Sequence, residues 1–178
     1  MTPDLARRFE SLEASRTLAL ALLDPHDRKI LNRAPAPGRW SAVQVLHHVV
    51  ESEAATLGYV RKKMQAGASL PRAGLASRLR RTAVELALAS PLRFRAPAVA
   101  ATVPEEIDPA ELRARWDAVR HGLRELLASF PPELEDRLVF RHPVAGRLGL
   151  ADALAVLQSH LDHHVPQVRQ AVIPRDSG

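Results

Sequence analysis

"RWSAVQVLHHV", residues 39–49, contains the clearest helix start in the chain. Ser41 and Gln44 have the spacing of a capping box, in which each side chain satisfies a free backbone N–H at the helix N-terminus. Trp40 and Val45 stand where a hydrophobic staple would place them. Apolar residues then recur at helical intervals, at Leu46, Val50, Leu57, Val60 and Met64. We therefore predict a helix from Ser41 to about Gln65.

Caps and spacing predict further helices on both sides of this one. The first begins at Thr2-Pro3 and runs to about residue 23, and a connection containing prolines and a glycine follows it. Later helices are expected over about 72–89, from Asp108 to about 129, and from about 150, after Gly149, to about 172. The stretch "DRLVFRHPVAGRLGL" before the last helix is expected to be extended or turn-like, and nothing alternates long enough to require a sheet. The sequence predicts an all-α four-helix bundle with an additional short helix or long connections.

The length of 178 residues suits a single domain over residues 1–178, and a hydrophobic content of 46% is typical of a globular protein. Only 4% of the residues are aromatic. A core built mainly from Leu, Val and Ala favours helices packed on helices. The chain has no cysteine, which excludes disulfides and thiolate metal sites, so any thiol chemistry needs a thiol from outside. We find neither a signal-peptide pattern nor an apolar run long enough to cross a bilayer, and we expect a cytoplasmic protein with no membrane partner.

The formal net charge of +5 is concentrated in residues 61–95, which hold nine Lys or Arg residues and one acid, Glu85. Such a stretch can attract nucleic acid or a small anionic ligand. Aromatic side chains that would stack on bases are absent there apart from Phe94. We therefore favour a solvated, arginine-rich helix face, and a nucleic-acid partner is not expected.

Three histidines crowd the stretch "LQSHLDHHVPQV", residues 157–168. His160 and His164 are four apart, so on a helix they lie on one side and can reach one ion. Catalytic zinc sites usually take three protein ligands and leave a position for water or substrate. The third ligand must then come from elsewhere, and the spacing alone leaves a histidine-rich, solvated helix face as an alternative.

The candidates for a third ligand are carboxylates and the remaining histidines, His26, His47, His48, His121 and His142. His121 is expected to be exposed, and His142 precedes a proline in a connection from which it can approach a pocket. His48 shares a helix side with Val45, Val49, Ser52 and Tyr59, a face of smaller residues suited to lining a cavity.

Two stretches together resemble the DinB/YfiT-like superfamily of four-helix-bundle metalloproteins. "APGRWSAVQVLHHVVESE" is similar to that family's Trp-Ser helix start, which has a histidine eight residues after the Trp and selects His48. "SHLDHHVPQV" is similar to its closing H-x-x-x-H-x-x-Q element, which selects His160, His164 and Gln167. "RFRAPAVAATVP", "HPVAGRLGL" and a W…R…L pattern at Trp116, Arg120 and Leu123 follow the family's order between them.

The resemblance implies a bundle of up-down-down-up type with a divalent metal ion, zinc or nickel, held by His48, His160 and His164. It also implies an S-transferase that moves a low-molecular-weight thiol, of the bacillithiol or mycothiol type, onto an electrophilic small molecule. Gln167, His142 and Tyr59 are the candidate pocket or supporting residues, and a homodimer is expected. His47 and His163 are interpreted as bystanders.

Two departures from the family's pattern bear on the site. Val165-Pro166 follows His164 where the family frequently has Arg-Gly, and a proline inside a helix removes a hydrogen bond to the carbonyl of Asp162. We expect a bend there that redirects Gln167. Glu53 lies about 140° around the helix from His48, so an inter-helix ion pair is the better interpretation for it.

Other functions stay open at this point. A metal-dependent hydrolase needs a general base, and no carboxylate stands out for that role. A third alternative is a non-catalytic, stress-related bundle that holds a structural or adventitious ion. In a structural site, protein groups would occupy all coordination positions of the ion. Nucleic-acid binding through residues 61–95 would show steep salt dependence.

Overall fold

Four long helices, each beginning after a capping position that the sequence marks, form the body of the fold. They are α1 Pro3–Ala21, α3 Ala42–Met64, α5 Pro109–Ala128 and α6 Leu150–Val172. Ser41 Oγ accepts a hydrogen bond from the Gln44 backbone N–H at 3.3 Å, and Gln44 Oε1 accepts one from the Ser41 backbone N–H at 3.0 Å. This confirms the predicted capping box. Asp108 likewise caps α5, while the Thr2 side chain forms no capping bond on α1.

The computed structural model describes residues 1–74, 79, 82, 103–142 and 146–173. The helix predicted over 72–89 and the "RFRAPAVAATVP" stretch lie mostly outside these residues. The start of that helix is wrong, because Arg72 pairs with Arg137 in an isolated antiparallel bridge. No helix among the described residues is both long and apolar enough to cross a membrane.

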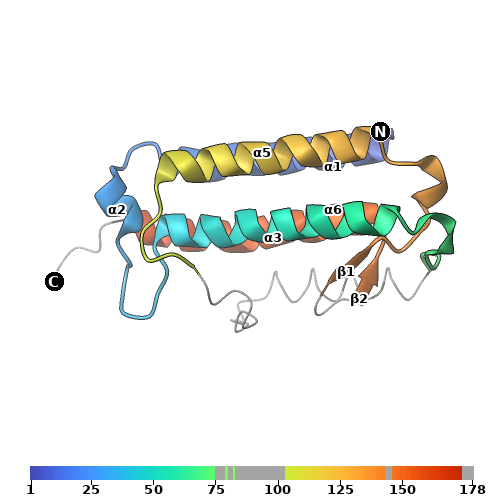
Figure 1. Cartoon of the computed structure of the whole chain (residues 1–178). Coiled ribbons are helices and arrows are strands. Elements are labelled where there is room, and N and C mark those ends of the chain that lie inside the picture. The colour runs from blue at the N-terminus through green and yellow to red at the C-terminus, as the bar shows by residue number, and fades with distance from the viewer. Residues whose placement is uncertain (75–78, 80–81, 83–102, 143–145, 174–178) are drawn as a thin grey trace.

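The helices form two layers, α1 beside α5 and α3 beside α6 (Figure 1). The colours show that α1 and α6 run one way along the bundle and that α3 and α5 run the other way. This is the up-down-down-up order. Because α3 and α5 are parallel, the chain must return along the bundle between them, and a short connection cannot make that return.

Short elements complete the described chain. Helix α2 Arg28–Asn32 starts at Asp27, whose carboxylate accepts from the Ile30 backbone N–H, inside the segment expected only to connect helices. A 3-10 turn, η1 Gly67–Ser69, follows α3, and another, η3 Pro132–Leu134, follows α5. Strands β1 Phe140–His142 and β2 Gly146–Leu148 pair antiparallel, with Phe140 opposite Leu148. The stretch is extended as expected, and two buried side chains, Phe140 and Leu148, anchor a small hairpin that no long alternation in the sequence requires.

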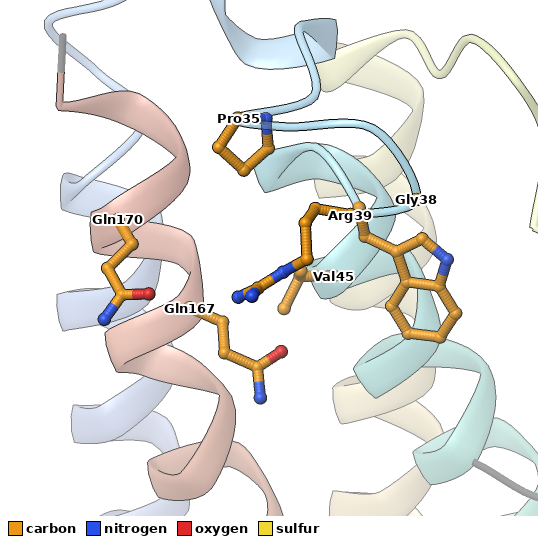
Figure 2. A pocket seen from close by; sticks show the side chains of 7 residues that line it. Pro35, Gly38, Arg39, Val45, Gln167 and Gln170 are labelled. Atoms are coloured by element: carbon orange, nitrogen blue, oxygen red, sulfur yellow. The ribbon is translucent and has the colours of Figure 1, made fainter. Parts of the chain in front are cut away.

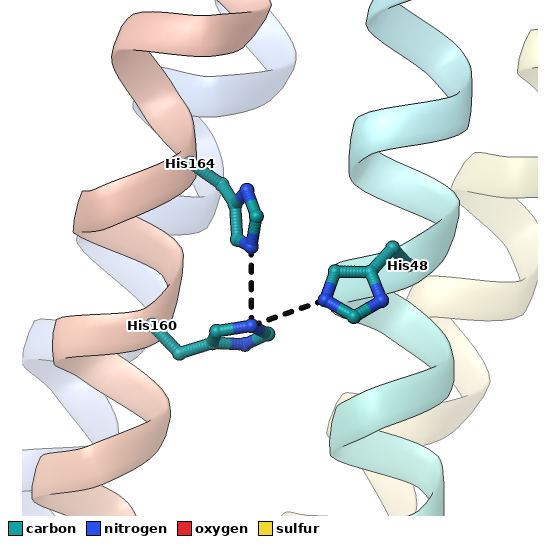
Figure 3. Close-up of side chains that lie close together, drawn as sticks. All are labelled: His48, His160 and His164. Atoms are coloured by element: carbon teal, nitrogen blue, oxygen red, sulfur yellow. Dashed lines mark hydrogen bonds between the residues drawn. The ribbon is translucent and has the colours of Figure 1, made fainter. Parts of the chain in front are cut away.

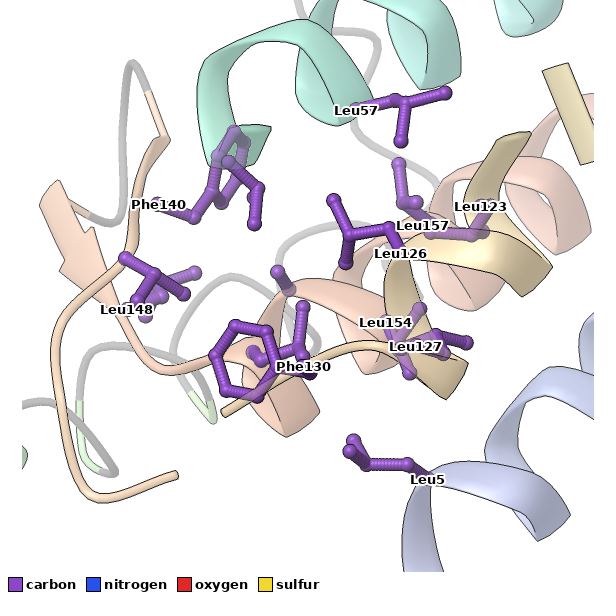
Figure 4. Close-up of a cluster of buried hydrophobic side chains, with 14 of the residues drawn as sticks. Leu5, Leu57, Leu123, Leu126, Leu127, Phe130, Phe140, Leu148, Leu154 and Leu157 are labelled. Atoms are coloured by element: carbon purple, nitrogen blue, oxygen red, sulfur yellow. The ribbon is translucent and has the colours of Figure 1, made fainter. Parts of the chain in front are cut away.

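The apolar core consists of two clusters, one at each end of the bundle. The hairpin-end cluster includes Leu5, Phe9, Leu57, Leu123, Phe140, Leu148 and Leu157 (Figure 4). The α2-end cluster includes Ala19, Leu23, Leu31, Val45, Val49, Trp116, Leu161 and Val168.

A buried ion-pair network lies between the two clusters. Glu53 is 2% exposed and accepts hydrogen bonds from Arg120 Nε at 2.7 Å, Arg120 Nη2 at 2.8 Å and Trp116 Nε1 at 2.9 Å. Arg120 also donates to Glu13 on α1 at 3.0 Å. The ion-pair interpretation of Glu53 is confirmed. The network joins α1, α3 and α5 and leaves the opposite side of α3 facing α6.

Candidate metal centre

Three imidazole nitrogens converge between α3 and α6 (Figure 3). His160 Nε2 lies 3.2 Å from His48 Nε2 and 3.1 Å from His164 Nε2. One nitrogen from each ring lies within 4.8 Å of the other two, and no other such group of three is found among the described residues. The structure thus brings together the three histidines selected from the sequence.

The backbone explains this convergence. His160 and His164 are one turn apart on α6, so both rings leave the same side of that helix. His48 lies in the second turn of α3, between the buried residues Val45 and Val49, which pack in the α2-end cluster. Because α3 and α6 are packed neighbours, that face of α3 directs His48 at the histidine pair on α6.

The spacing of the nitrogens fits a shared cation. Zinc–nitrogen bonds of about 2.0–2.1 Å at tetrahedral angles place the nitrogens about 3.3–3.4 Å apart. The two measured separations, 3.2 and 3.1 Å, are close to that value. Imidazole nitrogens suit zinc, nickel, copper and iron, and the donor set alone does not choose among them.

The protons of the three rings support the same conclusion. A neutral imidazole has one N–H and one lone pair. Gln167 Oε1 lies 3.3 Å from His164 Nδ1 and accepts its proton, which leaves a lone pair on His164 Nε2. A single proton on His160 Nε2 forms one linear hydrogen bond, yet this atom faces two nitrogens. Hydrogen bonding alone therefore leaves one contact unsatisfied, whereas a cation satisfies all three lone pairs.

Burial keeps these rings neutral. It lowers the pKa of His164 to about 4, with further lowering from the nearby His48. Burial also lowers the pKa of His160 well below the ordinary value, and the neighbouring His164 and His48 lower it further. The pKa of His48 is also lowered, first by burial and then by His47. Neutral imidazoles are the form that binds metal ions, so these donors are available at neutral pH.

Two neighbouring side chains hold the site in place. Helix α6 continues through Pro166 to Val172, and Gln167 reaches His164, so the proline does not carry Gln167 away from the site. The ring of Trp40 lies 5.3 Å from that of His48. The Trp-Ser motif marked this tryptophan as a helix start, and its contact with His48 was not foreseen.

The other candidate residues lie around or away from the three histidines. His142 on β1 is half-buried; burial lowers its pKa, and its charge contributes to lowering the pKa of His160. Tyr59 contacts Phe140 with ring centroids 5.9 Å apart, about 16 Å along α3 from His48 at the helical rise per residue. His163 packs its ring against His164 at 5.2 Å. His121 is exposed, as expected, and faces Glu125.

A pocket of about 170 Å³ lies between the connection that precedes α3 and helix α6 (Figure 2). Gln167 and Trp40, which contact His164 and His48, are part of its lining. The remaining lining residues are Pro35, Gly38, Arg39, Val45 and Gln170. Sequence reasoning missed both Arg39 and Gln170: Arg39 opens the Trp-Ser stretch, but only the tryptophan, the cap and the histidine were interpreted there, and Gln170 belongs to no motif.

Comparisons with known proteins agree with this fold. YfiT from Bacillus subtilis, described as a probable metal-dependent hydrolase with an unusual four-helix bundle topology, superposes with a TM-score of 0.60 at 17% identity. The match covers 96% of this chain and 87% of that one. Curated proteins give no match. The model of the DinB superfamily matches residues 11–168, almost the whole bundle, and the chain belongs to that superfamily.

Proposed function

We propose that His48, His160 and His164 bind one divalent metal ion, zinc or nickel, and that the protein transfers a low-molecular-weight thiol to an electrophilic small molecule. The observation that carries this proposal is the convergence of three Nε2 atoms, at 3.2 and 3.1 Å about His160. The similarity to YfiT, itself described as metal-dependent, supports the metal.

The residues of the site contribute charge, orientation and shielding. A divalent ion held by neutral imidazoles supplies uncompensated positive charge, which lowers the pKa of a coordinated thiol or water. Gln167 fixes the proton of His164 on Nδ1 and so keeps the Nε2 lone pair directed at the site. The Trp40 ring packs beside His48 and restricts its rotation.

The surroundings favour a thiol over water as the group that is activated. Water needs a general base or a much larger fall in pKa than a thiol, whose ordinary pKa is already near 8.5. Among the described residues no carboxylate joins the histidine group, and Glu53 is committed to Arg120 and Trp116. With no cysteine in the chain, the thiol must be a diffusible one.

A metal-dependent hydrolase is the second candidate. The description of YfiT as a hydrolase favours it, and burial lowers the pKa of the half-buried His142, which keeps its imidazole in the neutral form that a general base requires. The lack of a carboxylate base among the described site residues ranks it below thiol transfer.

Elemental analysis tests the metal centre. Protein purified without an affinity tag should contain close to one equivalent of a divalent transition metal, and His160→Ala should lose most of it. His163→Ala is the matched control, because His163 lies on the same helix next to His164 but outside the group of three nitrogens. Equal metal content in His160→Ala and the control would remove the basis of the proposal.

Assays with metal-loaded protein separate the two reactions. Thiol transfer should appear as loss of free bacillithiol-type or mycothiol-type thiol in the presence of an epoxide or alkyl halide, and His160→Ala should abolish it. Hydrolysis of ester or amide substrates without any thiol would instead establish the second candidate. Fully loaded protein that is inactive in both screens would indicate a non-catalytic metal-binding bundle.

A further inference from the structure

The connection between α2 and α3 directs one cationic side chain toward the site. Gly38 has φ +71°, in the left-handed region that favours glycine, and the Arg39 backbone N–H closes the turn on Ala36 O at 3.1 Å. Figure 2 shows the Arg39 side chain reaching from this turn into the space between α3 and α6, toward Gln167. The turn thus places a guanidinium in the pocket.

The charge of Arg39 is not compensated within the described part of the protein. The pocket lining contains no carboxylate, and the side chain of Arg39, a half-buried residue, makes no hydrogen bond or ion pair with the described residues. Three arginines in this half of the bundle have carboxylate partners: Arg28 with Glu106, Arg113 with Asp24, and Arg115 with Glu51. Arg39 shares its lack of a partner among the described residues with the exposed Arg33 and Arg169, and it differs from them in lining a pocket. The Arg39 guanidinium is therefore free to form charge-assisted hydrogen bonds with an anionic ligand in the pocket.

The pocket shares two walls with the candidate metal centre. Gln167 lines the pocket and contacts His164, and Trp40 lines the pocket and packs against His48. A volume of about 170 Å³ is smaller than the roughly 300 Å³ at which pockets begin to hold a drug-sized ligand. The pocket therefore fits one end of a small molecule whose other end lies at the histidines.

We propose that Arg39 is a specificity-determining residue that binds a carboxylate on the ligand whose reacting end occupies the three-histidine site. This proposal rests on the proposed function. A planar guanidinium fork matches the two oxygens of a carboxylate, and the amides of Gln167 and Gln170 line the same pocket. One guanidinium supplies one positive charge, which suits a singly charged carboxylate better than a phosphate dianion.

The test measures binding of two small thiols to cobalt-loaded protein. The probes are 3-mercaptopropionate and its uncharged amide, and the readout is the absorbance of sulfur-to-cobalt charge transfer. Wild-type protein should bind the carboxylate probe about tenfold to a hundredfold more tightly than the amide. Arg39→Ala should remove this preference while leaving the affinity for the amide and the cobalt content unchanged.

Two further variants make the result specific. Arg39→Lys keeps the charge without the planar fork and should retain only part of the preference. Arg33→Ala, which removes an exposed arginine from the same connection, should bind both probes as wild type does.

Each remaining outcome has a defined meaning. Equal affinities of wild-type protein for the two probes, or an equal loss of both affinities in Arg39→Ala, would overturn the role of Arg39 while leaving the metal centre intact. Failure to take up cobalt, or no charge-transfer band with either thiol, would overturn the proposed function and this proposal with it.

Discussion

Glu53 is a carboxylate held almost entirely out of water by donors from a single neighbouring helix. Arg120 gives it two charge-assisted hydrogen bonds and Trp116 gives a third. Burying a charge is costly unless it is paired and hydrogen-bonded in this way. The stability of this pair therefore depends on both partners being present.

Replacing Glu53 by glutamine should strongly destabilise the fold. The neutral amide leaves Arg120 a buried charge with only Glu13 as a partner, so we expect a loss of about 3–5 kcal/mol in the free energy of unfolding. Glu51→Gln is the matched control, because Glu51 pairs with Arg115 at the surface and should cost at most about 1 kcal/mol. Urea unfolding measures both, and similar losses in the two variants would contradict the argument.

The buried imidazoles predict how the stability of the metal-free protein depends on pH. Their pKa values are lower in the folded state than the value of about 6.5 expected for the unfolded chain, and that of His164 is about 4. The unfolded state therefore takes up protons first, and stability is lost as the pH falls from about 6.5 toward 4. Thermal unfolding of metal-free protein across this range should show the decline.

A pair of variants assigns that decline to the site. His164→Gln carries no titrating imidazole at this position, so its melting temperature should fall less between about pH 7 and pH 4 than that of wild type. His121→Gln changes an exposed histidine and should follow wild type, since the acidic groups that titrate in this range are common to all three proteins. Parallel curves for all three would show that the buried histidines do not carry the effect.

Helix α3 presents different chemistry on two sides. One side directs His48 at α6, and the other packs on α5 through Glu53, Leu57 and Arg61. At the α5 contact the helices approach closely at Gly122, whose carbonyl accepts from Arg61 Nη2 at 3.1 Å. A Cβ added there would meet Leu57 Cδ2 at 3.0 Å and Arg61 Nη2 at 3.1 Å.

Gly122→Ala should therefore not give the stability that alanine usually brings to a helix. Gly58→Ala, on an exposed part of α3 with nothing within 4 Å, should gain about 0.5–1 kcal/mol in the free energy of unfolding. Overpacking against Leu57 should leave Gly122→Ala less stable than Gly58→Ala by about 1–3 kcal/mol. Denaturant unfolding of the two variants tests this prediction. Equal increases in the free energy of unfolding would show that the α3–α5 contact accommodates the added methyl group without strain.

The elements that the sequence predicted best are those with explicit caps and several turns of apolar spacing. Ser41–Gln44 and Asp108 each have a local hydrogen-bonding role, so both helix starts were readable without tertiary information. Helix α2 and the hairpin were missed because each is too short for a periodic signal. Asn32 of α2 is held by two hydrogen bonds to the Ile107 backbone, a partner that only the fold supplies.

Prediction of the site had a comparable limit. The spacing of His160 and His164 predicted a pair on one helix face, but the choice of His48 over His47 came from a resemblance. The bend at Pro166 was expected only because proline removes a backbone hydrogen bond. That argument says nothing about side chains, so it could not predict the contact between Gln167 and His164.

Along the bundle, a charged layer separates two apolar clusters. Glu13, Glu53 and Arg120 each lie between the two clusters on their own helices. Their ion pairs therefore determine how α1, α3 and α5 are aligned relative to one another along the bundle axis. Apolar periodicity identifies a helix but does not say in which direction it runs relative to its neighbours. The parallel arrangement of α3 and α5 was therefore predicted from the family resemblance and not from the spacing of apolar residues.

Metal binding should stabilise the entire bundle, because the three ligands come from two helices far apart in the chain. With free metal at a hundred times its dissociation constant, the free energy of unfolding should rise by about 2.7 kcal/mol. Calorimetry with and without a chelator measures this, using His160→Ala as the variant that should not respond. An equal response of that variant would assign the stabilisation to other sites.

The tilted packing of Trp40 against His48 gives the protein an intrinsic optical reporter. Only two indoles are present, and the second, Trp116, is fully buried against Arg120 and Glu53. Emission from Trp40 in a Trp116→Phe background would therefore come from a single fluorophore whose ring centroid lies 5.3 Å from that of a candidate ligand. Quenching by a paramagnetic ion such as nickel would then follow occupancy directly in solution, without any added label.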